Sequence, residues 1–285
     1  MHTYLKRFAF LSLSGVIGAI SGAYNHNSVH SAEISWAVLV TVIAIIGIGF
    51  GLIGTALVSL YRHYFNNAQN EKPAEWSLVF SALLGSVFFI ALAFLIGFWA
   101  QLGPVDSFQL SAEAVLLGLA TTLPMLLLLV ALEKWDHPRV SAFREQQIDF
   151  FQGLGFELTP IRIVLLSLGA GIGEELLFRG AIQANLTNHL PIILAIAIPS
   201  FIFGILHSAN RIYMALAGII SIYLGIVFHI TGNILVPILA HTIYDIIAFI
   251  YTDRLIKARQ NARSAGPEDA PTIETTVDMK DLSDP

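Results

Sequence analysis

The apolar residues of this chain gather into long runs that short polar connections separate. A helix needs roughly 20 apolar residues to cross the hydrocarbon core of a bilayer, and eight runs approach or exceed that length. These eight predicted spans cover residues 8–24, 34–60, 76–99, 111–132, 161–183, 190–206, 211–230 and 234–252. The pattern predicts an all-α polytopic membrane protein with about eight transmembrane helices.

The amino-acid composition supports this interpretation and excludes several kinds of functional site. Of the residues, 55% are hydrophobic and 12% are charged, whereas soluble domains carry roughly 25% charged residues. The chain has no cysteine, which excludes disulfides, a thiolate nucleophile and a thiolate metal site. A net charge of −5 gives no sign of nucleic-acid binding.

The basic residues fall on alternate connections between the predicted spans. Every one of the 15 lysines and arginines except Arg179 lies on the same face of an eight-span arrangement. The residues on that face are Lys6, Arg7, Arg62, Lys72, Lys134, Arg139, Arg144, Arg162, Arg211, Arg254, Lys257, Arg259, Arg263 and Lys280. Because positive charge stays in the cytoplasm, we expect both termini to be cytoplasmic.

The first span has a second interpretation. Lys6 and Arg7 precede an apolar run that ends in the small residues Ser21, Gly22 and Ala23, which is also the pattern of a cleavable signal peptide. Cleavage would leave seven spans with the same loop orientation. We favour an uncleaved helix.

The chain divides into four predicted regions. Residues 1–132 hold the first four spans, and 161–252 hold the other four. Residues 133–160 form a polar cytoplasmic connection with several aromatics, either a helix lying at the membrane interface or an ordinary loop. Residues 253–285 are polar, with Pro267 and Pro271, and are predicted to be a disordered cytoplasmic tail.

Three ionisable residues lie inside the fifth predicted span. Glu174, Glu175 and Arg179 have apolar sequence on both sides, and a charge in mid-bilayer costs on the order of 2.5–3.5 kcal/mol by insertion scales. Glu175 and Arg179 are four residues apart, so they share a helix face and can pair. Glu174 is rotated by about 100° from Glu175. A carboxyl group without a tight partner in an apolar site suits proton transfer near neutral pH.

Two further polar groups lie at later spans. Phe203 stands one turn before His207 at the end of the sixth span, where the ring can form a pocket wall. His241 and Asp245 are four residues apart within the eighth span, and thus on one face. We expect Glu174 and these residues to converge on one cavity that contains water.

Two chemistries fit such a cavity. Glutamate and histidine side chains can activate a water for attack on a peptide carbonyl, with His241 and a neighbour stabilising the oxyanion. Alternatively, Glu174, His207, His241 and Asp245 can hold Zn²⁺ and lower the pKa of its bound water.

Two functions other than hydrolysis also remain open. Membrane carboxylates and histidines form proton relays in transporters, although transporters usually have two related halves and the ionisable residues here lie in the C-terminal half. A non-catalytic membrane scaffold or immunity protein with the same fold is the third hypothesis.

The ordered set Glu174-Glu175-x-x-x-Arg179, Phe203-x-x-x-His207 and His241-x-x-x-Asp245 resembles the motifs of the CPBP intramembrane proteases. This family includes CAAX prenyl endopeptidases of the Rce1 type and bacterial relatives linked to bacteriocin processing or immunity. The likeness covers about residues 160–252. The family's helical fold agrees with eight spans, which is the reason to keep the first helix.

The resemblance implies a role for each matching residue. It implies that Glu174 activates water with His207, and that Glu175 and Arg179 support Glu174. His241 and Asp245 match the pair on the oxyanion side. Family members often carry asparagine where this chain has Asp245, and an ionised aspartate cannot donate a hydrogen bond. Asp245 is therefore protonated, orients His241, or accompanies a metal.

The resemblance also implies a substrate and a location. The substrate is a membrane-associated peptide or protein, and whether it is lipidated is left open. We expect a bacterial inner membrane, with the cavity open to the cytoplasm and no cofactor required by the water mechanism. One difficulty remains, since straight helices place His207 about 10 Å nearer the cytoplasm than Glu174. A kink at Pro199 is one remedy.

Overall fold

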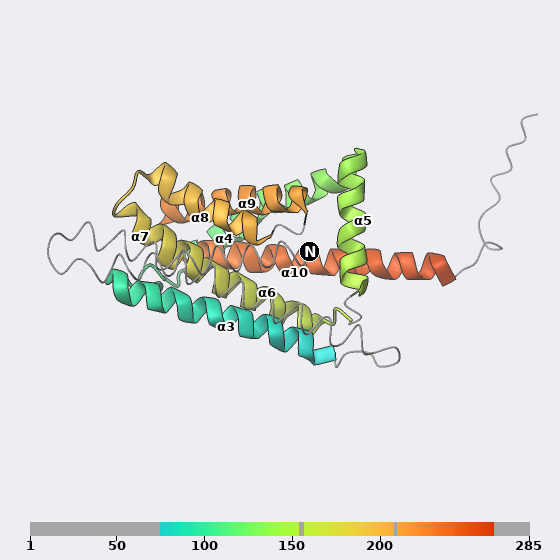
Figure 1. The fold of residues 1–285 in the computed structure, drawn as a ribbon, viewed down its shortest axis with the longest axis horizontal. Helices are drawn as coiled ribbons and strands as arrows, with labels where there is room; N and C mark the ends of the chain where they lie inside the picture. Colours follow the sequence, from blue (N-terminus) through green and yellow to red (C-terminus); the bar gives the residue numbers. More distant parts are fainter. Residues whose placement is uncertain (1–74, 154–156, 208–209, 265–285) are drawn as a thin grey trace, which may run out of the picture.

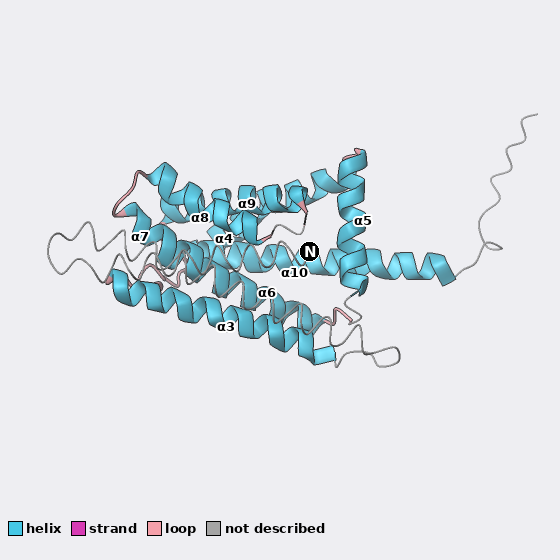
Figure 2. Cartoon of the chain, viewed as in Figure 1, coloured by secondary structure: helices cyan, strands magenta, loops and turns pink. Residues whose placement is uncertain are grey.

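The computed structural model describes residues 75–153, 157–207 and 210–264. Within these ranges every regular element is a helix (Figure 2), so the all-α prediction is confirmed for the described part of the chain. The first two predicted spans, 8–24 and 34–60, lie outside the described residues, as do both termini. The count of eight spans and the cytoplasmic termini therefore stay predictions.

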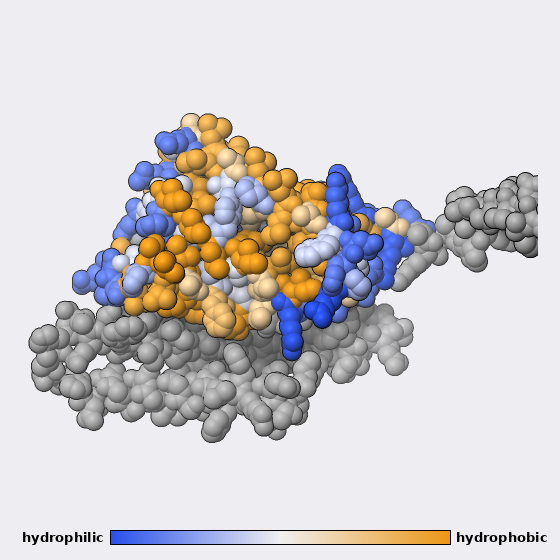
Figure 3. All heavy atoms as spheres, turned by 90° about the horizontal axis from the view of Figure 1, so that it is seen from above, coloured by the Kyte–Doolittle hydropathy of each residue, from blue (hydrophilic) through white to orange (hydrophobic). Residues whose placement is uncertain are grey.

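Four of the described helices are long and apolar enough to cross a membrane. They are α3 (Glu75–Ala100), α4 (Ala112–Lys134), α9 (Arg211–Thr231) and α10 (Leu235–Ser264). The shorter α8 (Ile192–Leu206) is also apolar. Each coincides with a predicted span, and the chain is an integral membrane protein. Figure 3 shows apolar side chains along the bundle and hydrophilic ones at its two ends.

The fifth predicted span is a helix that changes type in its middle. It begins as α6 (Pro160–Glu175), continues as a π-helical segment, η1 (Leu176–Gln183), and ends as α7 (Ala184–Thr187). Proline suits the first turn of α6 because it has no N–H to leave unpaired there. Every residue of η1 is buried. The change from α to π falls directly after Glu175.

Helix α6 packs between α3 and α10 (Figure 1). Two glycines make these close approaches possible. A Cβ atom at Gly173 would lie 3.0 Å from the backbone oxygen of Ser86 in α3, and one at Gly171 would lie 3.1 Å from the backbone nitrogen of Thr242 in α10. Small residues allow such contacts between membrane helices, and they bring the end of α6 against α10.

The connection between α4 and α6 contains a helix, α5 (Pro138–Gly153), that crosses the end of the bundle (Figure 1). The helical alternative for residues 133–160 is therefore the one observed. Arg144 of α5 donates to the backbone oxygen of Leu132 at 3.0 Å and to that of Glu133. These bonds satisfy carbonyl groups that the C-terminus of α4 leaves free.

The last helix is longer than predicted. The prediction of a disordered tail from residue 253 is wrong for residues 253–264, which continue α10. Lys257 pairs with Asp253 at 2.7 Å, and Arg259 pairs with Glu145 at 3.1 Å and Asp149 at 2.7 Å on α5. These contacts stabilise a polar helix outside the apolar span. Residues 265–285 lie outside the described residues.

Candidate active site

The two glutamates stand where α6 passes into the π-helical segment. π-Helical turns are rare and are frequent at functional sites. Oε1 of Glu175 lies 2.9 Å from Nη1 of Arg179, and the two side chains are 0% and 2% exposed. The ion pair predicted from the four-residue spacing of Glu175 and Arg179 is therefore present.

Neighbouring helices complete the surroundings of Arg179. Its Nη2 donates to the backbone oxygen of Ser221 on α9 at 2.7 Å and to the Ser221 hydroxyl at 2.9 Å. Its Cζ lies 5.6 Å from the centre of the Phe203 ring on α8. A buried ion pair is tolerable when further hydrogen bonds satisfy its donors and acceptors. This cluster therefore fixes η1 against α8 and α9.

Glu175 also holds His241. Nδ1 of His241 lies 2.8 Å from Oε1 of Glu175. Because a carboxylate paired with Arg179 can only accept, the imidazole Nδ1–H donates. The ring is thereby oriented with Nε2 toward Asp245, whose Oδ2 lies 3.6 Å away, and toward Glu174, whose Oε2 lies 3.9 Å away.

His207 directly follows the last residue of α8, and its ring is also held at Nδ1. That atom lies 2.8 Å from the backbone oxygen of Phe203, and a carbonyl oxygen only accepts, so Nδ1–H donates. In the neutral ring, Nε2 is then an acceptor. The imidazole stacks on Phe203 at 4.4 Å and meets the edge of Tyr213 at 5.4 Å between ring centres.

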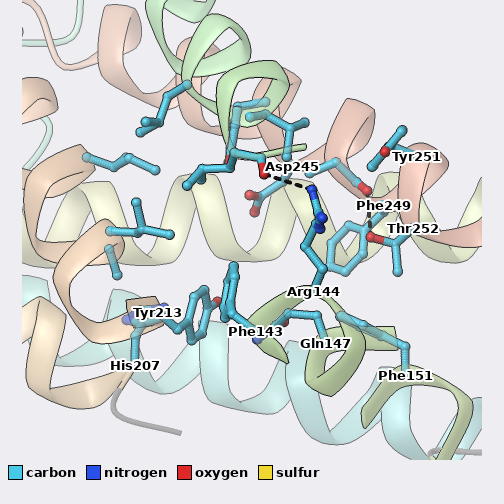
Figure 4. A pocket seen from close by; sticks show the side chains of 18 of the residues that line it. Phe143, Arg144, Gln147, Phe151, His207, Tyr213, Asp245, Phe249, Tyr251 and Thr252 are labelled. Atoms are coloured by element: carbon cyan, nitrogen blue, oxygen red, sulfur yellow. Dashed lines mark hydrogen bonds between the residues drawn. The ribbon is translucent and has the colours of Figure 1, made fainter. Parts of the chain in front are cut away.

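One cavity of about 360 Å³ is bordered by Glu174, Phe203, His207, His241 and Asp245. These side chains come from α6, α8 and α10. Figure 4 shows His207 and Asp245 among the side chains around this space. Most of the remaining lining is apolar and comes from α4, α5, α9 and the end of α10. Glu174 and His207 border the same cavity, and their relative depth in the membrane stays a prediction.

Sequence reasoning missed three contributions to this site. The link from Glu175 to His241 joins positions 66 residues apart, and neither motif alone indicates it. Tyr213 borders the cavity, but a tyrosine at the start of a span is ordinarily an interface anchor. Ser221 was one serine among many in apolar helices. The need of a buried arginine for several acceptors was the one available signal.

The arrangement does not match a metal site in the described part of the chain. No group of three or more His, Cys, Asp or Glu side chains among these residues is placed to hold a metal ion. Each imidazole uses Nδ1 on a protein acceptor, so only its Nε2 is left for the cavity. Zinc binding by Glu174, His207, His241 and Asp245 stays a prediction, and no step below depends on it.

Part of the chain that contains this site matches the model of a known protein family. Residues 156–247, about a third of the chain, match the family described as type II CAAX prenyl endopeptidase Rce1-like. The match contains every side chain of the predicted motifs: Glu174, Glu175, Arg179, Phe203, His207, His241 and Asp245. No curated protein and no solved structure matches the chain. The segment 156–247, which includes the acids and imidazoles of the cavity, therefore belongs to the Rce1-like family of CAAX proteases.

Proposed function

We propose that this protein is an intramembrane endopeptidase that hydrolyses a peptide bond of a membrane-associated protein or peptide. The observation that supports this function best is the shared cavity, because it combines two carboxyl groups and two imidazoles from three helices of an apolar bundle. Membrane segments rarely keep such groups without a use. The Rce1-like match of residues 156–247 independently favours a protease.

The proposed reaction begins with a water held between Glu174 and Nε2 of His207. One of these groups takes a proton from the water as its oxygen attacks the peptide carbonyl carbon, forming a C–O bond and a tetrahedral oxyanion. The same proton then passes to the peptide nitrogen, and the C–N bond breaks. The products are a carboxylic acid and an amine, so no redox partner or co-reactant beyond water is needed.

His241 is proposed to face the developing oxyanion. The hydrogen bond from Nδ1 of His241 to Oε1 of Glu175, 2.8 Å long, fixes the orientation of the imidazole ring. Arg179 in turn fixes Glu175. This chain of contacts prepares the imidazole orientation before substrate arrives, which is how electrostatic preorganisation lowers a barrier. Asp245, 3.6 Å from Nε2 of His241, is proposed to stabilise the imidazolium form.

The proposed location is a bacterial inner membrane, with the cavity open to the cytoplasm. The cavity extends from the acids toward α5 and the polar end of α10, where its lining includes Glu133, Arg144 and Thr252. Basic residues gather at that end of the bundle, including Arg139, Arg144 and Arg259, and positive charge favours the cytoplasmic side. The substrate would reach the site from the membrane interface.

The test uses the full chain, purified and placed in lipid nanodiscs. Cleavage of internally quenched peptides, with and without a farnesylated cysteine, is followed by fluorescence and mass spectrometry. Glu174→Ala and His207→Ala should each abolish cleavage. His229→Ala, which changes an exposed histidine on α9, should leave it intact. Cleavage that persists in both site variants would exclude the proposed mechanism.

A further inference from the structure

Peptide hydrolysis places negative charge on the carbonyl oxygen, and that charge needs hydrogen-bond donors. The end of the cavity where Glu174 and Asp245 lie is poor in them. Glu174 and Asp245 are both within 4 Å of Nε2 of His241, and an ionised carboxylate only accepts. A carbonyl oxygen that becomes an oxyanion here would therefore meet two groups that repel it.

The two imidazoles leave little donor capacity. His241 donates its Nδ1–H to Glu175, and His207 donates its Nδ1–H to the backbone oxygen of Phe203. In the neutral His207 ring, Nε2 is an acceptor, as activation of water requires. Only Nε2–H of a protonated His241 is left for the oxyanion. A second donor has to come from another side chain.

Tyr213 on α9 has a hydroxyl that meets this need. Its ring is held between the imidazole of His207, edge to face at 5.4 Å, and the ring of Phe143 on α5, nearly parallel at 6.3 Å. Figure 4 shows Tyr213 beside His207 and Phe143 at the wall of the cavity. The side chain borders the same cavity as Glu174 and Asp245.

The Tyr213 hydroxyl is also available. The side chain contacts the imidazole of His207 and borders the cavity together with Asp245 and Glu174, so it lies at the reacting end of the cavity. Within residues 75–153, 157–207 and 210–264 it makes no hydrogen bond. Tyr244, the neighbouring tyrosine of the lining, instead packs its ring against a separate apolar cluster.

We propose that the Tyr213 hydroxyl donates a hydrogen bond to the oxyanion of the tetrahedral intermediate, as the partner of His241. This inference rests on the proposed peptidase function. It explains how the site works with an aspartate at position 245, since the tyrosine supplies the donor that this aspartate lacks. The ring contacts with His207 and Phe143 fix the direction of the hydroxyl before substrate binds.

The first experiment compares Tyr213→Phe with the wild type on a cleavable peptide in nanodiscs. Phenylalanine keeps the ring contacts and removes the hydroxyl alone. Loss of one oxyanion donor typically lowers kcat by about 10²–10³-fold, and we expect a fall of that order with KM nearly unchanged. Tyr223→Phe is the matched control, because its hydroxyl donates to the backbone oxygen of Thr121 at 3.0 Å outside the cavity lining.

The second experiment tests whether an asparagine at position 245 can supply the hydrogen-bond donor that Tyr213→Phe removes. Asparagine has nearly the shape of aspartate and adds an N–H donor. The loss caused by Tyr213→Phe should therefore be smaller in an Asp245→Asn background than in the wild type. Binding of a phosphinic peptide, whose anionic tetrahedral centre resembles the intermediate, should weaken in Tyr213→Phe by a factor similar to the loss in kcat.

The outcomes separate the two proposals. Wild-type kcat in Tyr213→Phe, or a loss that is equal in both backgrounds, would overturn the role of Tyr213 while leaving the peptidase intact. No cleavage by the wild type, or cleavage that both Glu174→Ala and His207→Ala leave unchanged, would instead reject the peptidase function. A loss that appears only as a higher KM would show that the hydroxyl binds substrate and does not stabilise the oxyanion.

Discussion

Oε1 of Glu175 lies 2.8 Å from Nδ1 of His241, although the two residues are 66 positions apart. The same oxygen lies 2.9 Å from Nη1 of Arg179. One carboxylate oxygen therefore accepts from a guanidinium and an imidazole, and it connects the π-helical segment to α10. The fold of this region and the orientation of its histidine depend on the same atom.

Replacing Glu175 should reduce both stability and activity. Glu175→Ala leaves Arg179 buried with an uncompensated charge, and removing one partner of a buried pair costs about 3–5 kcal/mol. Thermal unfolding of the detergent-purified protein should show a clearly lower Tm, and cleavage should be lost. A Tm equal to that of the wild type would contradict the structural role given to this carboxylate.

Glu174→Gln should act on the reaction alone. Glutamine keeps the size of the side chain but cannot take a proton from water, so the rate should fall by at least about 10²-fold, the lower range for general acid–base catalysis. The Tm should stay near the wild-type value, because Glu174 makes no ion pair with Arg179 among the described contacts. Equal losses of Tm in Glu174→Gln and Glu175→Gln would argue against this division of roles.

Arg179→Lys should be destabilising even though the charge is kept. Arg179 donates through Nη1 to Glu175 and through Nη2 to both oxygens of Ser221, and a lysine ammonium cannot reproduce that planar fork. We expect a lower Tm and a large loss of activity. As a comparison, Ser221→Ala removes one of these bonds and should cost about 1 kcal/mol.

The approach of α6 to α3 can be tested with a pair of glycines. A Cβ at Gly173 would lie 3.0 Å from the Ser86 backbone oxygen, while one at Gly85 on α3 would meet nothing within 4 Å. Gly173→Ala should therefore cost about 1–3 kcal/mol through overpacking and lower activity by displacing Glu174. Gly85→Ala should leave both properties unchanged, and the reverse order would refute this packing.

Metal dependence is tested by elemental analysis of the purified protein together with a chelator. The water mechanism predicts substoichiometric zinc and full cleavage in the presence of 1,10-phenanthroline. Stoichiometric zinc, with cleavage lost on chelation and restored by added Zn²⁺, would favour the alternative in which Glu174, His207, His241 and Asp245 are ligands.

The sequence predicted much of this arrangement because the bilayer imposes simple rules. Apolar length located α3, α4, α8, α9 and α10, and the cost of charge in an apolar span selected Glu174, Glu175 and Arg179. The end of α10 was missed because its stability comes from ion pairs between Arg259 and α5, which hydropathy does not register.

The partners within the site were harder to predict than its members. The four-residue spacing indicated Glu175 with Arg179, but His241 with Glu175 depends on how α6 and α10 are packed. Tyr213 depends on the placement of α9 against α5 and α8. Tertiary pairings of this kind have no periodicity, so no local pattern reports them.

The π-helical segment also limits how this chain can change in length. A π turn accommodates an additional residue compared with an α turn. Deleting one residue between Glu175 and Arg179 would allow a more regular α-helix, yet it would rotate everything beyond the deletion by about 100° relative to Glu175. The shorter helix would be more regular, but the guanidinium of Arg179 would no longer reach the carboxylate of Glu175. Sequences of relatives aligned with this chain should therefore show no gap between Glu175 and Arg179.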